Sequence, residues 1–266
     1  MIDLHIHSEF SPDSNIALVD VVEEAIRKNL KIISFTDHFD AEDLREFNPV
    51  HLDFNNYVKE ISSLKKRYES EIKILLGIEI GLQDEGKYLP FYDDIINKYP
   101  FDFVIGSVHK GPDGSWVDFN SYLKQGSILK MTLVYYQYIL DCISKFSNFD
   151  VLGHLNVIDR YVNFPVSFDD VKKILIKIFM KLVEKNKGLE INTSGEKYFM
   201  AEKTMPTKKM LELYKILGGN IITIGSDSHT SNTVGNEYDY AKNLAEEIGF
   251  RSLSYFENRE LKTIPI

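Results

Sequence analysis

Short apolar runs alternate along the chain with longer segments in which apolar residues recur every three to four positions. The short runs have the length of buried strands, and the longer segments have the period of helices that bury one face. This alternation is typical of βα units built around a parallel sheet. The predicted strands cover residues 2–6, 31–36, 72–78, 101–108, 150–154, 188–192 and 220–225.

The clearest predicted helix covers residues 168–187. Ser167 with Asp170 resembles a capping box at its start, and Gly188 follows its end, so both termini carry the expected residues. Residues 17–30 show a similar apolar spacing. Further helices are predicted at 55–69, 127–145, 205–218 and 237–248.

Seven such units without a linker predict a single α/β domain over residues 1–266. A closed or nearly closed (β/α)7 barrel of the TIM type fits this order. An open, doubly wound sheet is the alternative, because hydrophobic period does not distinguish a closed sheet from an open one. In both architectures, functional side chains are expected at the carboxyl ends of the strands.

Charge and cysteine content narrow the class of protein. Lys and Arg number 31 against 40 Asp and Glu, a net charge of -9, which argues against binding nucleic acid through its phosphates. Cys142 is the single cysteine, so disulfides and a thiolate zinc site are excluded and a reducing compartment is expected. It falls in an amphipathic helical stretch and is predicted to be a core residue. The start lacks a signal-peptide pattern, and no run approaches the roughly 18 apolar residues of a membrane helix. We therefore expect a cytoplasmic protein without membrane or nucleic-acid partners.

Polar residues cluster where the predicted strands end. The first strand ends in His5-Ile6-His7, and the period of two puts both imidazoles on one face. Six of the seven histidines lie at strand ends, and only His51 lies in a loop, where we expect it to be solvated. The polar residues at or near the other strand ends are Asp37, His38, Glu79, His109, His154, Asn192, Asp227 and His229.

A single histidine at a strand end is more often structural than a metal ligand. A barrel, however, directs all its strand ends at one place. Packing several imidazoles beside Glu79, Asp227 and Asp13 would be costly unless a cation satisfied them. The sequence therefore predicts a metal centre, and imidazole and carboxylate without thiolate suit zinc, iron or manganese.

The number of candidate ligands predicts more than one metal ion. Nine side chains are too many for one site and suit two or three divalent ions. Three such ions bring about six positive charges, of which three carboxylates remove about three. That surplus favours a bound hydroxide and an anionic substrate, and metal ions grouped in this way typically catalyse attack on a phosphate ester.

At these residues the sequence resembles the polymerase and histidinol phosphatase (PHP) superfamily over essentially its whole length. The shared motifs are, in family order, His5-Ile6-His7-Ser8, Thr36-Asp37-His38, Gly77-Ile78-Glu79, Ser107-Val108-His109, Gly153-His154 and Ser226-Asp227-Ser228-His229. Chain length and the segments around Asp13, Asp159-Arg160-Tyr161 and Glu190-Ile191-Asn192 resemble the single-domain histidinol-phosphate phosphatases. The resemblance implies a distorted (β/α)7 barrel with a trinuclear metal site.

The resemblance also implies a ligand set for each ion. The first ion would take His5, His7, Glu79 and Asp227, and the second would share Glu79 and add His109 and His154. The third would take His38, His229 and the residue six positions beyond His7. Several branches of the family have histidine there, whereas this chain has Asp13 in a Ser-Pro-Asp-Ser turn.

The implied reaction is hydrolysis of L-histidinol phosphate to L-histidinol and phosphate by a hydroxide that bridges two metals. Glu79, Asp227 and Arg160 would be the catalytic residues, with Arg160 as a bidentate phosphate contact and Lys197 as a second cation for the substrate. Asp37 either orients a metal ligand or simply makes a turn. Trp116 lies either in a loop over the site or in a surface turn.

Two other functions remain open at this point. The same fold and metals could act on nucleotides or nucleic-acid ends, although the acidic balance argues against it. A degenerate barrel with a regulatory role would require lost ligands, whereas every ligand position here holds a competent side chain. The sequence does not indicate the oligomeric state.

Overall fold

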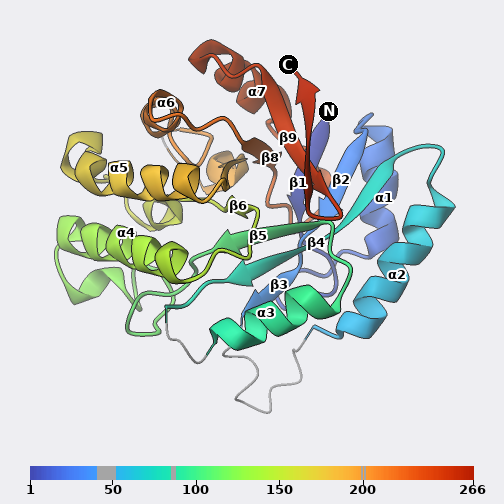
Figure 1. Cartoon of the computed structure of the whole chain (residues 1–266), viewed down its shortest axis with the longest axis horizontal. Coiled ribbons are helices and arrows are strands. Elements are labelled where there is room, and N and C mark those ends of the chain that lie inside the picture. Colours follow the sequence, from blue (N-terminus) through green and yellow to red (C-terminus); the bar gives the residue numbers. More distant parts are fainter. Residues whose placement is uncertain (41–51, 85–87, 199, 201) are drawn as a thin grey trace.

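The computed structural model describes residues 1–40, 52–84, 88–198, 200 and 202–266. Its main sheet is parallel, and its strands follow one another around the sheet in the order of the chain (Figure 1). The predicted strands are confirmed. They are β1 (Ile2–Ile6), β2 (Ile32–Phe35), β4 (Lys73–Gly81), β5 (Phe103–Ser107), β6 (Val151–Leu152), β7 (Gly188–Asn192) and β8 (Ile222–Gly225).

The two edges of this sheet meet, so the sheet is nearly closed into a barrel. The backbone N–H of Asp227 donates to the carbonyl of His5 at 2.8 Å, and the N–H of His7 donates to the carbonyl of Ser228 at 2.9 Å. The strand order does not reverse at any point, as a doubly wound sheet would require. The predicted barrel is therefore confirmed, and the open-sheet alternative is wrong.

Helices connect successive strands and surround the barrel (Figure 1). One of them, α3, was not expected from the sequence. The helices are α1 (Leu18–Arg27), α2 (Phe54–Arg67), α3 (Leu89–Lys98), α4 (Ile128–Lys145), α5 (Phe168–Glu184), α6 (Lys208–Ile216) and α7 (Tyr238–Ile248).

The N-terminus of α5 agrees with the predicted signals, and its C-terminus does not. Ser167 is the N-cap, and its hydroxyl donates to the Asp170 carboxylate at 2.7 Å. The helix ends at Glu184, so Gly188 does not terminate it and instead begins β7. The chain reverses before that glycine through Asn186, whose φ of 53° lies in the left-handed region that asparagine tolerates.

A short strand, β3 (His38–Asp40), is absent from the predicted elements. It pairs in parallel with the end of β4, and His38 lies opposite Glu79 in this ladder. Three residues are too few to show a hydrophobic period. The extra pairing nevertheless fixes the position of His38 relative to Glu79.

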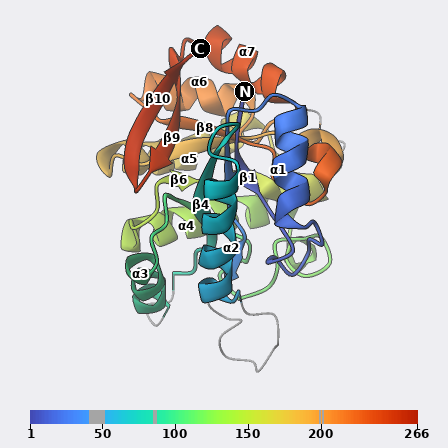
Figure 2. The same cartoon turned by 90° about the vertical axis from the view of Figure 1, so that its right-hand side faces the viewer.

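A hairpin after the last barrel strand was also not expected. It consists of β9 (Ser252–Glu257) and β10 (Glu260–Pro265), and both views place it beside the N-terminus (Figures 1 and 2). Arg259 in its turn donates from its backbone to the carbonyl of Asp102 at 2.9 Å, and from Nε to the carboxylate of Asp150 at 2.7 Å. These partners directly precede β5 and β6. The hairpin therefore packs at the amino ends of the strands, away from the site at their carboxyl ends.

The core agrees with the predicted apolar pattern. Cys142 is buried in α4, and burial raises the pKa of its thiol, so the predicted core role is confirmed. None of the helices in the described part of the chain is both long and apolar enough to cross a membrane. The prediction for His51 falls outside the described residues.

Candidate metal centre

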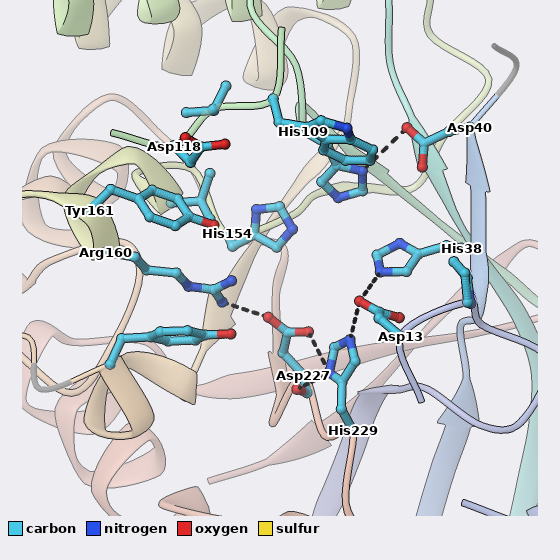
Figure 3. Close-up of a pocket in the computed structure, with 15 residues that line it drawn as sticks. Asp13, His38, Asp40, His109, Asp118, His154, Arg160, Tyr161, Asp227 and His229 are labelled. Atoms are coloured by element: carbon cyan, nitrogen blue, oxygen red, sulfur yellow. Dashed lines mark hydrogen bonds and ion pairs between the residues drawn. The ribbon is translucent and has the colours of Figure 1, made fainter. Parts of the chain in front are cut away.

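All nine predicted ligands lie together at the carboxyl end of the barrel. Five of them are buried (His5, His7, Glu79, His154 and Asp227), three are partly exposed (His38, His109 and His229), and Asp13 is half-exposed. Figure 3 shows the six that line the pocket: Asp13, His38, His109, His154, Asp227 and His229. They come from strands and loops that are far apart in the sequence. Three overlapping groups bring their ligand atoms within 4.8 Å of one another: His5, His7 and Asp227; His38, Glu79 and His109; and His7, Asp13, His38 and His229.

The first group lies where β1 meets the segment after β8. The Nε2 atoms of His5 and His7 are 3.1 Å apart. The Oδ1 atom of Asp227 lies 3.8 Å from the first Nε2 and 3.3 Å from the second. Asp227 adopts a φ of 53°, a conformation that an aspartate tolerates better than most residues and that often occurs at functional sites. Closure of the barrel therefore brings these three ligands together.

Glu79 occupies the middle of the cluster and is fully buried. Its Oε1 atom lies 2.9 Å from Nε2 of His154 and 3.3 Å from Nε2 of His109. Its Oε2 atom lies 2.8 Å from Nδ1 of His38 and 3.4 Å from Nε2 of His5. This carboxylate can bridge two ions, as the sequence-based ligand set requires.

Asp13 reaches the cluster from the loop after β1. Its Oδ2 atom lies 3.1 Å from Nε2 of His229 and 3.5 Å from Nε2 of His38. The side chain is half-exposed, with 54% of its surface accessible. Its position facing both histidines, rather than inside its own turn, supports a ligand role for the carboxylate in place of the family's histidine.

The electrostatics of the cluster fit divalent cations. Burial opposes charge on Glu79, yet the neighbouring imidazoles of His5 and His109 hold its pKa well below the usual range. Burial also opposes charge on His5, but Glu190 and Glu79 raise its pKa well above the usual value. Oε2 of Glu79 has no well-aligned hydrogen-bond donor among the described residues despite the nitrogens around it. A buried carboxylate oxygen facing imidazole nitrogens in this way is the environment of a metal ligand.

A glycine makes room for the crowded ligands. A Cβ added at Gly225 would lie 2.3 Å from the Cβ of His5 and 2.5 Å from Oε1 of Glu190. Real Cβ atoms do not approach other atoms so closely, so only glycine fits before the Ser226-Asp227 ligand segment. The Gly-Ser-Asp motif thus has a packing reason as well as a chemical one.

Several residues that support the ligands were not singled out from the sequence. Glu190 in β7 contacts Nδ1 of His5 at 2.6 Å, and Ser107 donates to Oε1 of Glu79 at 2.6 Å. Asp40 in β3 lies 3.4 Å from Nδ1 of His109. Glu190 alternates with Asn192 at the end of a predicted strand, so the period of two was the available signal. Its partner, 185 positions away, could be found only from the closed barrel.

Of the two roles that the sequence left open for Asp37, the structure supports the orientation of a metal ligand. It is fully buried, and its carboxylate accepts hydrogen bonds from Ser8 and Ser11. Burial raises the pKa of Asp37, and these donors act against that shift. Ser11 also contacts Nδ1 of His7 at 3.0 Å, so Asp37 reaches a candidate ligand through this hydroxyl.

Arg160 lies beside the cluster in a 3-10 turn (Val157–Tyr161). Its Nη2 donates to Oδ2 of Asp227 at 2.6 Å, and its guanidinium packs 4.3 Å from the ring centroid of Tyr198. Only 8% of the side chain is exposed, and that part faces the pocket (Figure 3). Lys197 is exposed and does not line this pocket. The geometry therefore brings Arg160, and not Lys197, to the site.

A pocket of about 560 Å³ opens directly over the cluster. Beyond the candidate ligands it is lined by the aromatic residues Trp116, Tyr161 and Tyr198 and by the acidic Asp118. The ring of Trp116 stacks 6.5 Å from that of His109 and is 52% exposed. Of the two interpretations open for Trp116, the structure thus supports the loop over the site.

Nine imidazole and carboxylate side chains lie together at the strand ends of this parallel barrel, below an open pocket. The fold and the site therefore define the class of protein: a barrel that binds several metal ions. The family model for the PHP domain matches residues 3–194, and the chain belongs to this family.

The chain is similar to characterised relatives over nearly its full length. It is 32% identical to the histidinol-phosphatase of Lactococcus lactis subsp. lactis, over 98% of this chain and 96% of the relative. It is 27% identical to the histidinol-phosphatase of Bacillus subtilis, over 89% and 96%. The crystal structure of histidinol phosphate phosphatase from Lactococcus lactis, described as a complex with zinc, L-histidinol and phosphate, superposes with a TM-score of 0.83 at 30% identity and 98% coverage of both chains.

Proposed function

We propose that this protein is a metal-dependent phosphomonoesterase that hydrolyses L-histidinol phosphate to L-histidinol and phosphate. The convergence of all nine candidate ligands in one cluster, six of which line the pocket, carries the proposal for the chemistry. The full-length similarity to histidinol-phosphatases supports the proposal for the substrate. The reaction would serve histidine biosynthesis.

The family resemblance implies three ligand sets, and the geometry of the cluster is compatible with them. His5, His7 and Asp227 would hold one ion, with Glu79 shared between it and a second ion at His109 and His154. Asp13, His38 and His229 would hold a third ion. When bound, two or three zinc, iron or manganese ions would lower the pKa of water and offset the charge of a phosphate ester.

Arg160 would bind the phosphate group of the substrate. Its guanidinium borders the pocket, and a guanidinium can donate two parallel hydrogen bonds to phosphoryl oxygens. The ion pair with Asp227 holds the guanidinium beside the first ligand set. The phosphate would then lie between the cations of the site and this fixed guanidinium.

The outer half of the pocket suits the rest of the substrate. Histidinol carries an ammonium group and an imidazole ring. Asp118 supplies a negative charge, and Trp116, Tyr161 and Tyr198 supply ring faces that can pack against an imidazole or a cation. A nucleic-acid end would meet an acidic rather than a basic surface here, in a chain of net charge -9.

The test is a comparison of kcat/KM for metal-loaded protein on L-histidinol phosphate, AMP, p-nitrophenyl phosphate and a bis-aryl phosphodiester. We expect a preference of several orders of magnitude for L-histidinol phosphate. Similar slow rates on all monoesters would keep the metal phosphatase and reject the substrate. A preference for the diester would favour the nucleic-acid alternative. Glu79→Gln is the control, since it should lose bound metal and activity together.

We also propose that residues 1–266 form one PHP domain that functions in the cytoplasm. One sheet continues from residue 2 to residue 225, and the C-terminal hairpin packs on that same barrel, which supports a single unit. The buried, unpaired Cys142 is compatible with a reducing compartment.

A further inference from the structure

We propose that two buried carboxylates outside the ligand cluster, Glu190 and Asp37, fix His5 and His7 in the tautomer that leaves both Nε2 atoms free to bind a cation. Glu190 acts directly on His5, and Asp37 acts on His7 through Ser11. They are positioning residues, since neither touches the pocket. This inference rests on the proposed metal-binding function of the same site.

Glu190 determines the proton position on His5. The carboxylate is buried in β7, and its Oε1 atom lies 2.6 Å from Nδ1 of His5. Its other oxygen accepts from the backbone N–H of His154 at 2.7 Å and from the side-chain amide of Asn192 at 3.2 Å. An ionised carboxylate only accepts hydrogen bonds. When His5 binds a cation, the proton held by Glu190 therefore stays on Nδ1, and Nε2 supplies the lone pair.

Ser11 determines the proton position on His7. A serine hydroxyl has one proton to donate and two lone pairs. The hydroxyl of Ser11 donates that proton to Oδ1 of Asp37 at 2.6 Å, and its oxygen accepts from the backbone N–H of His38 at 3.1 Å. The remaining contact, 3.0 Å to Nδ1 of His7, must then have the imidazole as donor. Nε2 of His7 is left without a proton.

Asp37 fixes the direction of the hydrogen bond between Ser11 and His7, in which His7 is the donor. Its carboxylate also accepts from the backbone N–H of Ser8 at 2.7 Å and from the Ser8 hydroxyl at 2.8 Å. Together with Ser11, three donors surround it, and hydrogen bonds to the charged form offset the cost of burying it. The Ser11 proton is thus drawn away from His7 and not toward it.

The two fixed tautomers give the cluster its affinity for a cation. Both bare Nε2 atoms face each other at 3.1 Å, beside Oε2 of Glu79 and Oδ1 of Asp227. Facing lone pairs and carboxylate oxygens repel one another until a positive ion lies between them. In the opposite tautomers, N–H protons would point into the cluster and compete with the ion. Hydrogen-bond partners of ligating histidines commonly act in this way.

The experiment uses full-length protein with ¹⁵N-labelled histidine and zinc as the probe. Long-range ¹H–¹⁵N correlation spectra of the wild type should show His5 and His7 with Nδ1 protonated and Nε2 bound to zinc. Zinc affinity is then measured by competition with a chelator at one fixed pH. We expect Ser11→Ala to bind zinc about 10- to 100-fold more weakly, with Ser11→Thr restoring most of the affinity.

Ser8→Ala is the matched control. It removes another hydroxyl that donates to Asp37, but that hydroxyl does not contact His7. A purely structural role for Asp37 predicts the same loss in both alanine variants. The tautomer role predicts a clearly larger loss in Ser11→Ala, because Ser8 acts only on Asp37 and its backbone N–H still donates to that carboxylate. Equal zinc affinity in Ser11→Ala and wild type, equal losses in both variants, or zinc bound through Nδ1 would overturn the inference. A wild type that binds none of zinc, iron and manganese would instead reject the proposed function.

Discussion

Among single residues, Arg160 is the cation that the fold places at the pocket, while Lys197, the weaker candidate from the sequence, does not line it. Arg160→Ala should lower kcat/KM for the phosphomonoester about 100-fold, because a fixed charged donor to the phosphate is lost. Arg160→Lys should recover only part of this loss, since an ammonium does not reproduce the planar donor pair. Metal content must be measured alongside, because Asp227 also loses a partner.

Lys197→Ala removes one positive charge from the neighbouring segment and serves as the matched control. We expect its kcat/KM to remain near that of the wild type. A comparable loss in both variants would mean that overall charge, rather than the position of Arg160, determines binding of the phosphate.

Asp159, the residue before Arg160, is the carboxylate whose ionisation should affect stability. Burial raises its pKa to about 6, against 3.8 for an ordinary aspartate, although Asn156 donates to it at 2.8 Å. The folded state then binds the proton more tightly than the unfolded state. The stability that this proton contributes is complete below about pH 4 and is lost as the pH rises to 6.

Asp159→Asn should therefore stabilise the protein increasingly between pH 4 and pH 7, by at most about 3 kcal/mol. Urea unfolding of the wild type and the variant at pH 4.5, 5.5 and 7 measures the difference in the free energy of unfolding. A constant difference across this range would show that Asp159 ionises normally in the folded state.

At the scale of elements, the close approach of β8 to β1 depends on the absence of a side chain at Gly225. Gly225→Ala should destabilise the fold by about 1–3 kcal/mol and weaken metal binding, because the added methyl group would overlap His5 and Glu190. Gly126→Ala is the control, since its methyl group would meet the flexible side chains of Met131 and Lys130. Equal thermal stability and metal content in the two variants would contradict this packing argument.

The elements that the sequence predicted are those with a long enough period to be recognised. Seven strands and six helices repeat their apolar residues over several positions, and the candidate ligands follow directly because parallel strands present their ends together. β3 has only three residues, too few to show a period, whereas α3 is as long as α1, and its length does not explain why it was missed. Supporting contacts such as Glu190 to His5 join residues whose proximity exists only after the barrel closes.

At the scale of the whole molecule, the candidate ligands lie in or directly after β1, β3, β4, β5, β6 and β8, so metal binding and stability should be linked. If zinc is present at 1,000 times its Kd, it should add about 4 kcal/mol of stability, which corresponds to a rise in Tm of about 10 °C. Thermal unfolding with zinc and with a chelator measures this rise. Glu79→Gln should show a much smaller difference, and an equally large one would place the stabilising ion outside this cluster.

The hairpin at the amino end of the barrel has a consequence for synthesis of the chain. Arg259 bonds to Asp102 and Asp150, and Lys73 pairs with Glu257, so the hairpin fastens three strands that leave the ribosome much earlier. More than a hundred further residues must be synthesised after these strands before the hairpin exists. The starts of β4, β5 and β6 therefore lack these contacts until the last residues are made, and we expect a nascent chain without the hairpin to aggregate more readily than the full chain.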